Sequence, residues 1–184
     1  MTVPSGPRES PESVGSADPS ERRGRPGQDG PGGVVIVPMR WWHLPAVMKA
    51  ERELFGAESW SEASFWSELA QPETRYYVVA EDARRPVEDR FAGYAGLAVF
   101  ADEAHVLTLG VLGDQQRRGV GTALLRDLLA TAAERGATTV LLDVRADNPT
   151  AQRLYARHGF VPTGIRKRYY QPSGTDAVVM VRNG

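Results

Sequence analysis

The chain has 184 residues, a formal net charge of -1 and no cysteine. This length suits one folded domain with a buried core, and the near-zero charge gives no electrostatic reason to expect a nucleic-acid partner. The lack of cysteine excludes disulfides, thiolate metal ligands and a cysteine nucleophile, and it fits a cytoplasmic location. No apolar run is as long as a membrane span and no signal-peptide core stands at the N-terminus, so we expect no membrane partner.

Residues 1–33 differ in composition from the rest of the chain. They are rich in Pro, Gly and Ser and contain few large apolar side chains. Such a segment cannot bury enough apolar surface to offset the conformational entropy that it would lose on ordering. We therefore predict a disordered N-terminal tail over 1–33 and one folded domain over 34–184.

The spacing of apolar residues divides the domain into helices and strands. In chain order the sequence predicts a strand over 34–37, helices over 44–55 and after Ser61, strands over 76–81, 91–100 and 105–111, a helix from Thr122 to Arg135, a strand over 138–145, a helix from Pro149 to Arg157, and a final hairpin of strands over 160–170 and 176–181. This order predicts an α+β fold in which helices cover both faces of a central sheet.

A basic, glycine-containing turn joins the strand over 105–111 to the helix that follows it. Its sequence is Gln116-Arg117-Arg118-Gly119-Val120-Gly121. Glycine lets the backbone approach a ligand closely, and a helix start offers unpaired N–H groups that bind anions. The turn lacks the Gly-Lys-Ser/Thr ending of a P-loop and the third glycine of a dinucleotide fingerprint. We therefore predict a pyrophosphate site for a diphosphate ligand of another kind.

Two motifs together resemble those of the GCN5-related N-acetyltransferase (GNAT) family. They are Gln116-x-x-Gly119-x-Gly121 and Asn148-Pro149-x-Ala151-x-x-Leu154-Tyr155-x-x-x-Gly159-Phe160, and the resemblance extends over about 34–182. Shorter motifs resemble one subgroup, the bacterial ribosomal-protein-alanine N-acetyltransferases of the RimI type. These are Glu51-Arg52-Glu53-Leu54-Phe55 with Trp60-Ser61, Asp102-Glu103-Ala104, Val144-Arg145-Ala146-x-Asn148, and Arg168-Tyr169-Tyr170 with Asp176-Ala177-x-x-Met180.

The resemblance implies the GNAT fold, a central mixed and mostly antiparallel sheet with helices on both faces. It also implies transfer of acetyl from acetyl-CoA to the N-terminal alanine of a small-subunit ribosomal protein, by direct attack of the amine on the thioester. We accordingly expect a cytoplasmic monomer that uses acetyl-CoA, binds a protein N-terminus and needs no metal. His43, His105 and His158 show no metal-ligand spacing.

The acetyl-CoA site implied by the resemblance runs from the strand end to the following helix. Backbone groups of Leu109 and Val111 would pair with the pantetheine arm as an added strand does. The full set of expected contacts is Leu109, Gly110, Val111, Gln116, Arg117, Arg118, Gly119, Val120, Gly121, Thr122, Asn148 and Tyr155.

Tyr155 is the expected general acid. A phenol, with a reference pKa of about 10, stays protonated at neutral pH and can donate a proton to a departing thiolate. The alternative is an aromatic side chain that packs beside Leu154 at helical spacing.

Asp143 is the expected general base, at the position where RimI-like enzymes carry glutamate. Strand alternation places it on one face with Leu141 and Arg145, and an unpaired carboxylate in so apolar a strand would be costly. Two interpretations stay open: a base that acts through water because aspartate is short, or an ion pair with Arg145 or Arg168. Glu103 is a rival base or an anchor for the amine, unless it is a solvated strand end.

Trp60, Glu103, Tyr169 and Tyr170 are expected to line a groove for the peptide N-terminus. Two other functions remain open. Acetylation of a small polycationic amine would need clustered carboxylates, and the basic Arg166-Lys167-Arg168 segment disfavours it. An acyl-CoA-binding module without catalysis is suggested by Asp143 and disfavoured by Tyr155.

Overall fold

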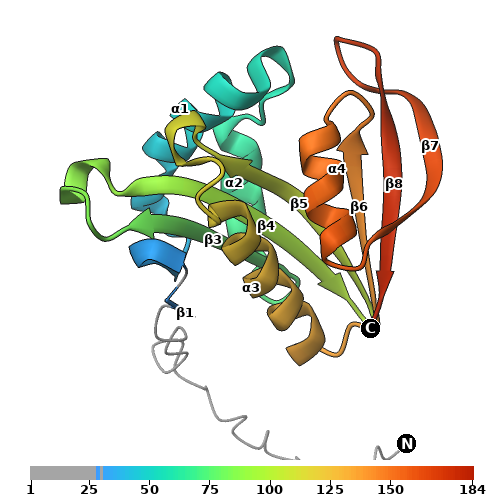
Figure 1. Cartoon of the computed structure of the whole chain (residues 1–184), viewed down its shortest axis with the longest axis horizontal. Coiled ribbons are helices and arrows are strands. Elements are labelled where there is room, and N and C mark those ends of the chain that lie inside the picture. The colour runs from blue at the N-terminus through green and yellow to red at the C-terminus, as the bar shows by residue number, and fades with distance from the viewer. Residues whose placement is uncertain (1–27, 30) are drawn as a thin grey trace, which may run out of the picture.

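The computed structural model describes residues 28–29 and 31–184. Within these residues one sheet contains eight strands in the order β1-β2-β3-β4-β5-β6-β8-β7 (Figure 1). The strands are β1 Gln28–Asp29, β2 Val34–Pro38, β3 Arg75–Asp82, β4 Phe91–Phe100, β5 Glu103–Val111, β6 Thr139–Arg145, β7 Val161–Tyr170 and β8 Thr175–Asn183. Neighbouring strands run antiparallel except β5 and β6, which run parallel. The predicted α+β fold with a mixed, mostly antiparallel sheet is confirmed.

The predicted tail, residues 1–33, lies for the most part outside the described residues. Of its last residues, Gln28–Asp29 pair with β2, and Pro31–Gly33 form a 3-10 turn directly before that strand. These residues precede the expected domain boundary at Val34.

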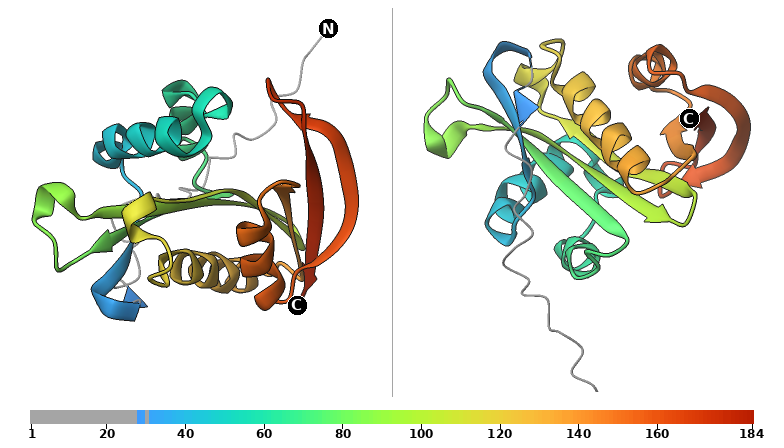
Figure 2. Two further views of the ribbon diagram at one scale, coloured as in Figure 1. Left: turned by 45° about the horizontal axis from the view of Figure 1, so that its top comes forward. Right: turned by 90° about the horizontal axis from the view of Figure 1, so that it is seen from below.

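Helices cover both faces of the sheet, as Figure 2 shows. Their bounds are α1 Leu44–Phe55, α2 Glu62–Leu69, α3 Val120–Glu134 and α4 Pro149–Arg157. α1 and α2 pack on one face, where Phe65 and Tyr94 are fully buried. α3 and α4 pack on the other face, where Leu124, Leu128 and Phe160 are buried. Two apolar layers therefore sandwich the central strands.

The predicted starts of α2 and α4 are confirmed by their capping contacts. Ser61 Oγ accepts a hydrogen bond from Ser64 N at the start of α2, and Asn148 Oδ1 accepts one from Ala151 N at the start of α4. α3 begins earlier than the expected Thr122, because Gly119 adopts a left-handed φ of 86° and serves as its N-cap. Glycine adopts this conformation without the steric cost that a side chain would add.

The two parallel strands separate partway along their length. β5 and β6 are paired only from Glu103 with Thr139 to Val106 with Leu142. A bulge in β5 follows at once, because the register with β4 steps from Val106 to Thr108 and leaves Leu107 without an opposite residue. Bulges re-aim side chains and end pairing. Residues 107–111 and 143–145 therefore form the two sides of a wedge-shaped opening in the sheet.

Candidate active site

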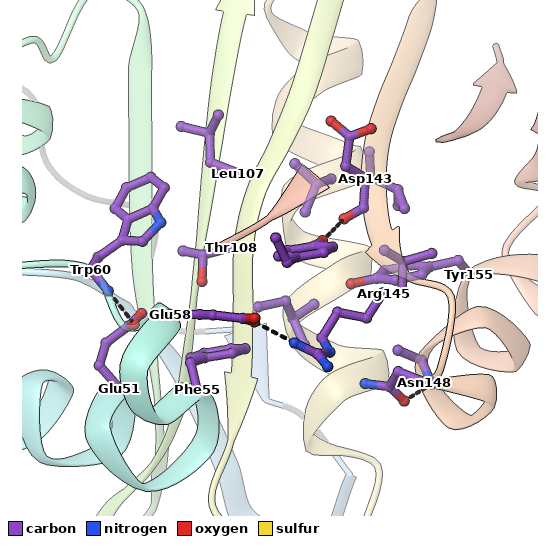
Figure 3. Close-up of a pocket in the computed structure, with 16 residues that line it drawn as sticks. Glu51, Phe55, Glu58, Trp60, Leu107, Thr108, Asp143, Arg145, Asn148 and Tyr155 are labelled. Carbon is purple, nitrogen blue, oxygen red and sulfur yellow. Dashed lines mark hydrogen bonds and ion pairs between the residues drawn. The ribbon is translucent and has the colours of Figure 1, made fainter. Parts of the chain in front are cut away.

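A cavity of about 140 Å³ lies in this opening (Figure 3). A volume of this size holds a few non-hydrogen atoms, so it suits the reacting groups of two substrates rather than a whole coenzyme. Helices from both faces of the sheet contribute to its walls. The lining residues are Glu51, Phe55, Glu58, Trp60, Val106, Leu107, Thr108, Leu109, Leu142, Asp143, Val144, Arg145, Asn148, Ala151, Tyr155 and Tyr170.

Tyr155 is in the cavity wall, where the sequence predicted a catalytic group. It is buried on α4, and its ring packs edge-on against Phe160 with the centroids 5.8 Å apart. Its hydroxyl points into the cavity (Figure 3). Burial raises the pKa of the Tyr155 phenol to about 12, so the hydroxyl keeps its proton throughout the neutral range.

Asp143 also lines the cavity, from β6, and its side chain is only 10% exposed. Its Oδ1 lies 3.2 Å from Arg166 Nε, and its Oδ2 lies 3.8 Å from His105 Nε2. The contact with Arg166 is close but poorly aligned, and Oδ1 accepts no hydrogen bond from the described residues. Asp143 is therefore a buried carboxylate that retains one unused acceptor.

The structure pairs Asp143 with neither Arg145 nor Arg168, the two partners that the sequence had left open as an alternative. The Arg145 guanidinium instead binds Glu58 and lies 2.7 Å from Asp147. Arg168 has a left-handed φ of 52° in an irregular part of β7, where the register with β8 is interrupted between Arg166 and Tyr170. This irregularity leaves Arg166, rather than Arg168, beside Asp143.

Glu58 is a cavity residue that the sequence analysis missed. Its carboxylate accepts hydrogen bonds from Arg145 at the end of β6 and from Ser173 in the β7–β8 loop. Burial raises the pKa of Glu58, but these two hydrogen bonds and the charge of Arg145 together lower it below its usual range. The guanidinium of Arg145 also lies over the Tyr170 ring, 5.6 Å from its centroid. The α1–α2 loop is thus joined to the far side of the opening.

Glu51 is a second missed residue, and it is almost fully buried. Its carboxylate accepts hydrogen bonds from Tyr94 Oη and, at 2.9 Å, from Trp60 N. Burial raises the pKa of the Glu51 carboxyl above its usual range. The sequence carried a signal, because Glu51 follows Leu44 and Val47 at the spacing of the buried helix face. This carboxylate fixes the loop that carries Trp60 into the cavity wall.

The expected substrate-side residues divide into two groups. Trp60 and Tyr170 line the cavity, and Tyr170 Oη donates a hydrogen bond of 3.1 Å to the Asp143 carbonyl. Tyr169 is 45% exposed and lies outside the wall, beneath the Arg166 guanidinium. Glu103 is exposed at the closed end of the opening, where β5 and β6 are still paired. The structure thus brings together Trp60, Tyr170, Asp143 and Tyr155, and leaves Glu103 and Tyr169 outside.

The strand end before the predicted pyrophosphate site is open on one edge. Gly110 pairs with Tyr94 on β4, and a Cβ at this position would lie 2.7 Å from the Tyr94 ring. Leu112 N also donates to β4, at the Ala92 carbonyl. Because strand residues alternate in direction, the backbone groups of Leu109 and Val111 point to the open edge.

The turn itself supplies several of the expected contacts. The Gln116 side chain donates a hydrogen bond of 3.2 Å to the Val111 carbonyl. Val120 is buried, so only its backbone is available, and Thr122 is half-buried in the first turn of α3. Gly121 faces α4, since a Cβ there would lie 3.4 Å from Leu154. The start of α3 therefore lies against α4, the helix that contributes Tyr155 to the cavity wall.

The two arginines of the turn have different surroundings. Arg118 donates hydrogen bonds to Gln115 at 2.9 Å and to the buried Asp82 at 3.2 Å. Hydrogen bonds from Arg84 hold the pKa of Asp82 well below its usual range, so the carboxylate is ionised. Arg117 is exposed and makes no hydrogen bond or ion pair with any residue that the structure describes. Arg117 is thus the cation available to a ligand, whereas Arg118 braces the turn.

The described residues contain neither a metal-binding cluster nor a membrane-spanning helix. No group of three or more His, Asp or Glu side chains in 28–29 and 31–184 could hold a metal ion. No helix in this part of the chain combines the length and the apolar character needed to span a bilayer.

Known proteins resemble this chain in sequence and in structure. The model of the acetyltransferase (GNAT) family matches residues 41–160. The N-alpha-acetyltransferase RimI of Mycobacterium tuberculosis is 42% identical over 138 residues, which cover 72% of this chain and 82% of that protein. The ribosomal protein bS18-alanine N-acetyltransferase of Salmonella typhimurium is 35% identical over 139 residues, which cover 74% and 88%.

A solved structure shows the same fold. The ribosomal-protein-S18-alanine N-acetyltransferase from Escherichia coli superimposes with a TM-score of 0.69 and 32% identity, covering 82% of this chain and 93% of that one. The family model spans more than half of the present sequence, and the identity to each relative exceeds 30% over most of the relative's length. This chain therefore belongs to the acetyltransferase (GNAT) family.

Proposed function

We propose that this chain transfers an acetyl group from acetyl-CoA to the N-terminal α-amino group of a protein, with the N-terminal alanine of ribosomal protein bS18 as the expected substrate. One observation carries the proposal. The cavity between β5 and β6 receives Trp60 from the α1–α2 face of the sheet and Tyr155 from the α3–α4 face. Two substrates can approach it from opposite faces and meet where the sheet is open. The relatives named above support the choice of a protein N-terminus.

The residues around the opening fit acetyl-CoA. Leu109 presents an open backbone edge for the amide groups of the pantetheine arm, while Gln116 already occupies the Val111 carbonyl. The N–H groups at the start of α3 and the exposed Arg117 suit the pyrophosphate. When bound, acetyl-CoA supplies a thioester whose carbonyl carbon is open to attack by an amine.

Tyr155 is proposed to stabilise the departing sulfur. Its phenol has a pKa of about 12, whereas a thiol has a reference pKa near 8.5, so complete proton transfer to a free thiolate would be uphill. The hydroxyl can still donate a hydrogen bond as negative charge develops on sulfur. It gives up its proton fully only as a proton from the attacking amine replaces it. Tyr155 is therefore a hydrogen-bond donor and a proton carrier between nitrogen and sulfur.

Asp143 is proposed to receive the substrate amine. An α-ammonium group has a reference pKa of about 7.7–8.0 and must lose a proton before its nitrogen can attack. Asp143 lines the cavity, and its enclosed Oδ1 accepts no hydrogen bond from the described residues, so a rotation of the carboxyl group would present this oxygen to the ammonium. Asp143 and Tyr155 both line the cavity, from β6 and α4 respectively. The reacting nitrogen would lie between them.

The small-amine alternative is less well supported by the cavity. Three carboxylates line it, but Glu51 binds Tyr94 and Trp60 and Glu58 binds Arg145 and Ser173, so only Asp143 retains an unused acceptor. A polyamine or aminoglycoside would have to displace these contacts. The retained Tyr155 also disfavours a binding module without catalysis.

A peptide panel tests the proposed function. The protein is incubated with acetyl-CoA and short peptides that begin with Ala, Ser, Gly or Met, and mass spectrometry detects the added acetyl group. The matched control is the Ala peptide with a blocked N-terminus and an internal lysine. We expect acetylation of the free Ala peptide and none of the control. Acetylation of the control, or acetylation only of small amines, would refute the proposal.

A further inference from the structure

His105 lies outside the cavity wall but beside Asp143, the proposed acceptor of the substrate amine. Ala104 and Val106, its neighbours on β5, are buried in the α3–α4 core. Strand alternation therefore turns His105 to the opposite face of the sheet, the face that Asp143 shares. His105 Nε2 lies 3.8 Å from Asp143 Oδ2. The imidazole does not line the cavity, and its side chain is 37% exposed to solvent.

The two oxygens of Asp143 have different surroundings. Oδ1 is buried and accepts no hydrogen bond from the described residues, although Arg166 Nε lies 3.2 Å away. Oδ2 faces His105. A distance of 3.8 Å exceeds a direct hydrogen bond, so a small side-chain rotation or a bridging water would complete the contact. Asp143 thus lies between the cavity, which it lines, and an imidazole that is partly exposed to solvent.

We propose that His105 and Asp143 form a proton relay that deprotonates the substrate ammonium. The relay rests on the proposed function, and His105 acts in it through Asp143 without touching the reacting atoms. The N–H bond of the ammonium breaks as Asp143 Oδ1 takes the proton. The carboxyl group then turns about its Cβ–Cγ bond, a broad two-fold torsion, and passes the proton to His105 Nε2. The exposed imidazolium releases it to solvent, which restores both groups.

Proton balance requires such an exit. An ammonium loses two protons on becoming an amide, and only one of them is needed to convert the thiolate into a thiol. Tyr155 carries that proton in the proposed mechanism. The other must reach solvent, and the relay accounts for it.

The charges near His105 favour this division of roles. The Arg166 guanidinium lies against Asp143, with Nε 3.2 Å from Oδ1. Histidine serves as a proton shuttle in many active sites. Glu103 shares the strand and is exposed, whereas Ala98, opposite His105 on β4, carries no charge. The imidazole therefore connects Asp143 with solvent.

Kinetics of four variants test the relay with acetyl-CoA and the Ala peptide. They are His105→Gln, Asp143→Asn, the double variant, and His43→Gln as a control that removes a histidine from a distant site. We expect His105→Gln to lower kcat by roughly 10–10²-fold near pH 6.5, because Asp143 remains but the proton leaves slowly. The loss should shrink toward pH 9, where the substrate amine is already neutral, and acetyl-CoA affinity should not change.

The double variant separates the relay from a structural role. If His105 acts through Asp143, the double variant is no slower than Asp143→Asn alone, because the two residues work as one unit. Added imidazole should also raise the rate of His105→Ala, since the site is open to solvent. Two results would overturn the relay. One is a decrease in kcat of His105→Gln that is equal at every pH. The other is a double variant whose kcat decreases by the product of the two single-variant factors.

A measurement without substrate distinguishes failure of the relay from failure of the proposed function. The ¹⁵N NMR signals of the three imidazoles are followed against pH, and His105→Gln assigns the His105 signals. We expect the His105 signals to differ between wild type and Asp143→Asn, because the neighbouring carboxylate has been replaced, and the His43 signals to stay unchanged. Unchanged His105 signals would exclude the pairing, whatever the enzyme acetylates. Inactivity of the wild type toward every peptide would refute the proposed substrate alone, and the kinetic comparison would then use the amine that is accepted.

Discussion

Replacing Arg117 and Arg118 separately by alanine tests the assignment of the pyrophosphate site. Adjacent arginines in a basic turn look equivalent in the sequence, yet the structure gives them different roles. Arg118 is hydrogen-bonded to Gln115 and to the buried Asp82, whereas Arg117 is exposed and unpaired among the described residues. We expect Arg117→Ala to weaken acetyl-CoA binding without lowering thermal stability. Arg118→Ala should lower the melting temperature by a few degrees.

The size of the Arg117 effect follows from its exposure. A hydrogen bond to a charged group contributes about 1.5–3 kcal/mol, and solvent screening at an exposed side chain reduces this to about 1–2 kcal/mol. The dissociation constant of acetyl-CoA should therefore rise roughly 5- to 30-fold. Residue 117 has a left-handed φ of 60°. Alanine and arginine both carry a Cβ, so the backbone strain at this position is about the same in the variant and in the wild type.

Isothermal titration with acetyl-CoA, paired with thermal melting, measures both quantities. Arg126→Ala is the matched control, because it removes an exposed arginine from α3 beyond its first turn. Raising the salt concentration should reduce the difference in acetyl-CoA affinity between Arg117→Ala and wild type, since salt screens exposed charges. Wild-type affinity in folded Arg117→Ala at low salt would refute the placement of the pyrophosphate beside this residue.

The remaining predictions concern the leaving group, the buried carboxylate and the tail. Tyr155→Phe should lower kcat roughly 10²–10⁴-fold with little change in acetyl-CoA affinity, because only the hydroxyl is lost. Full activity in a steady-state assay would contradict the role of Tyr155 as proton donor to the departing sulfur. Glu51 has a folded-state pKa above its unfolded value, so its contribution to stability is complete at low pH and is lost as pH rises through the folded pKa. The stability advantage of wild type over Glu51→Gln should therefore be larger at pH 4.5 than at pH 7.5 in denaturant unfolding, and a constant difference would argue against the buried carboxyl. Deletion of residues 2–27 should leave peptide acetylation and melting temperature nearly unchanged, and a large loss of activity would reveal a binding role for the tail.

Features set by neighbouring residues in the chain could be predicted from the sequence. The caps at Ser61 and Asn148 depend on a side chain and a backbone N–H three residues later. The alternation that buries Val140 and Leu142 and turns Asp143 to the other face depends only on strand geometry. These local rules located the elements, whereas the family resemblance pointed to Asp143 and Tyr155, which both line the cavity.

Features set by register between distant segments could not be predicted. Glu58 and Arg145 are 87 positions apart, and no local pattern connects them. The choice of Arg166 over Arg168 as the partner of Asp143 depends on an irregular register in β7 and a left-handed residue within it. Glu51 is an intermediate case, because its place on the apolar helix face was visible but its partners, Tyr94 and Trp60, were not.

The position of the site follows from the one parallel strand pair among the described strands. Parallel neighbours need a crossover connection, and α3 provides it by leaving the carboxyl end of β5 and returning the chain to β6. α4 then leaves the carboxyl end of β6, so both helices begin at the end where the two strands diverge. Ligands of open sheets bind in such a crevice, at the carboxyl ends of strands. The turn that ends at Gly121 and the helix that carries Leu154 are therefore brought into contact, and a Cβ on the glycine would lie 3.4 Å from the leucine. The proposed pyrophosphate site and the proposed proton donor lie side by side because both follow from this single crossover.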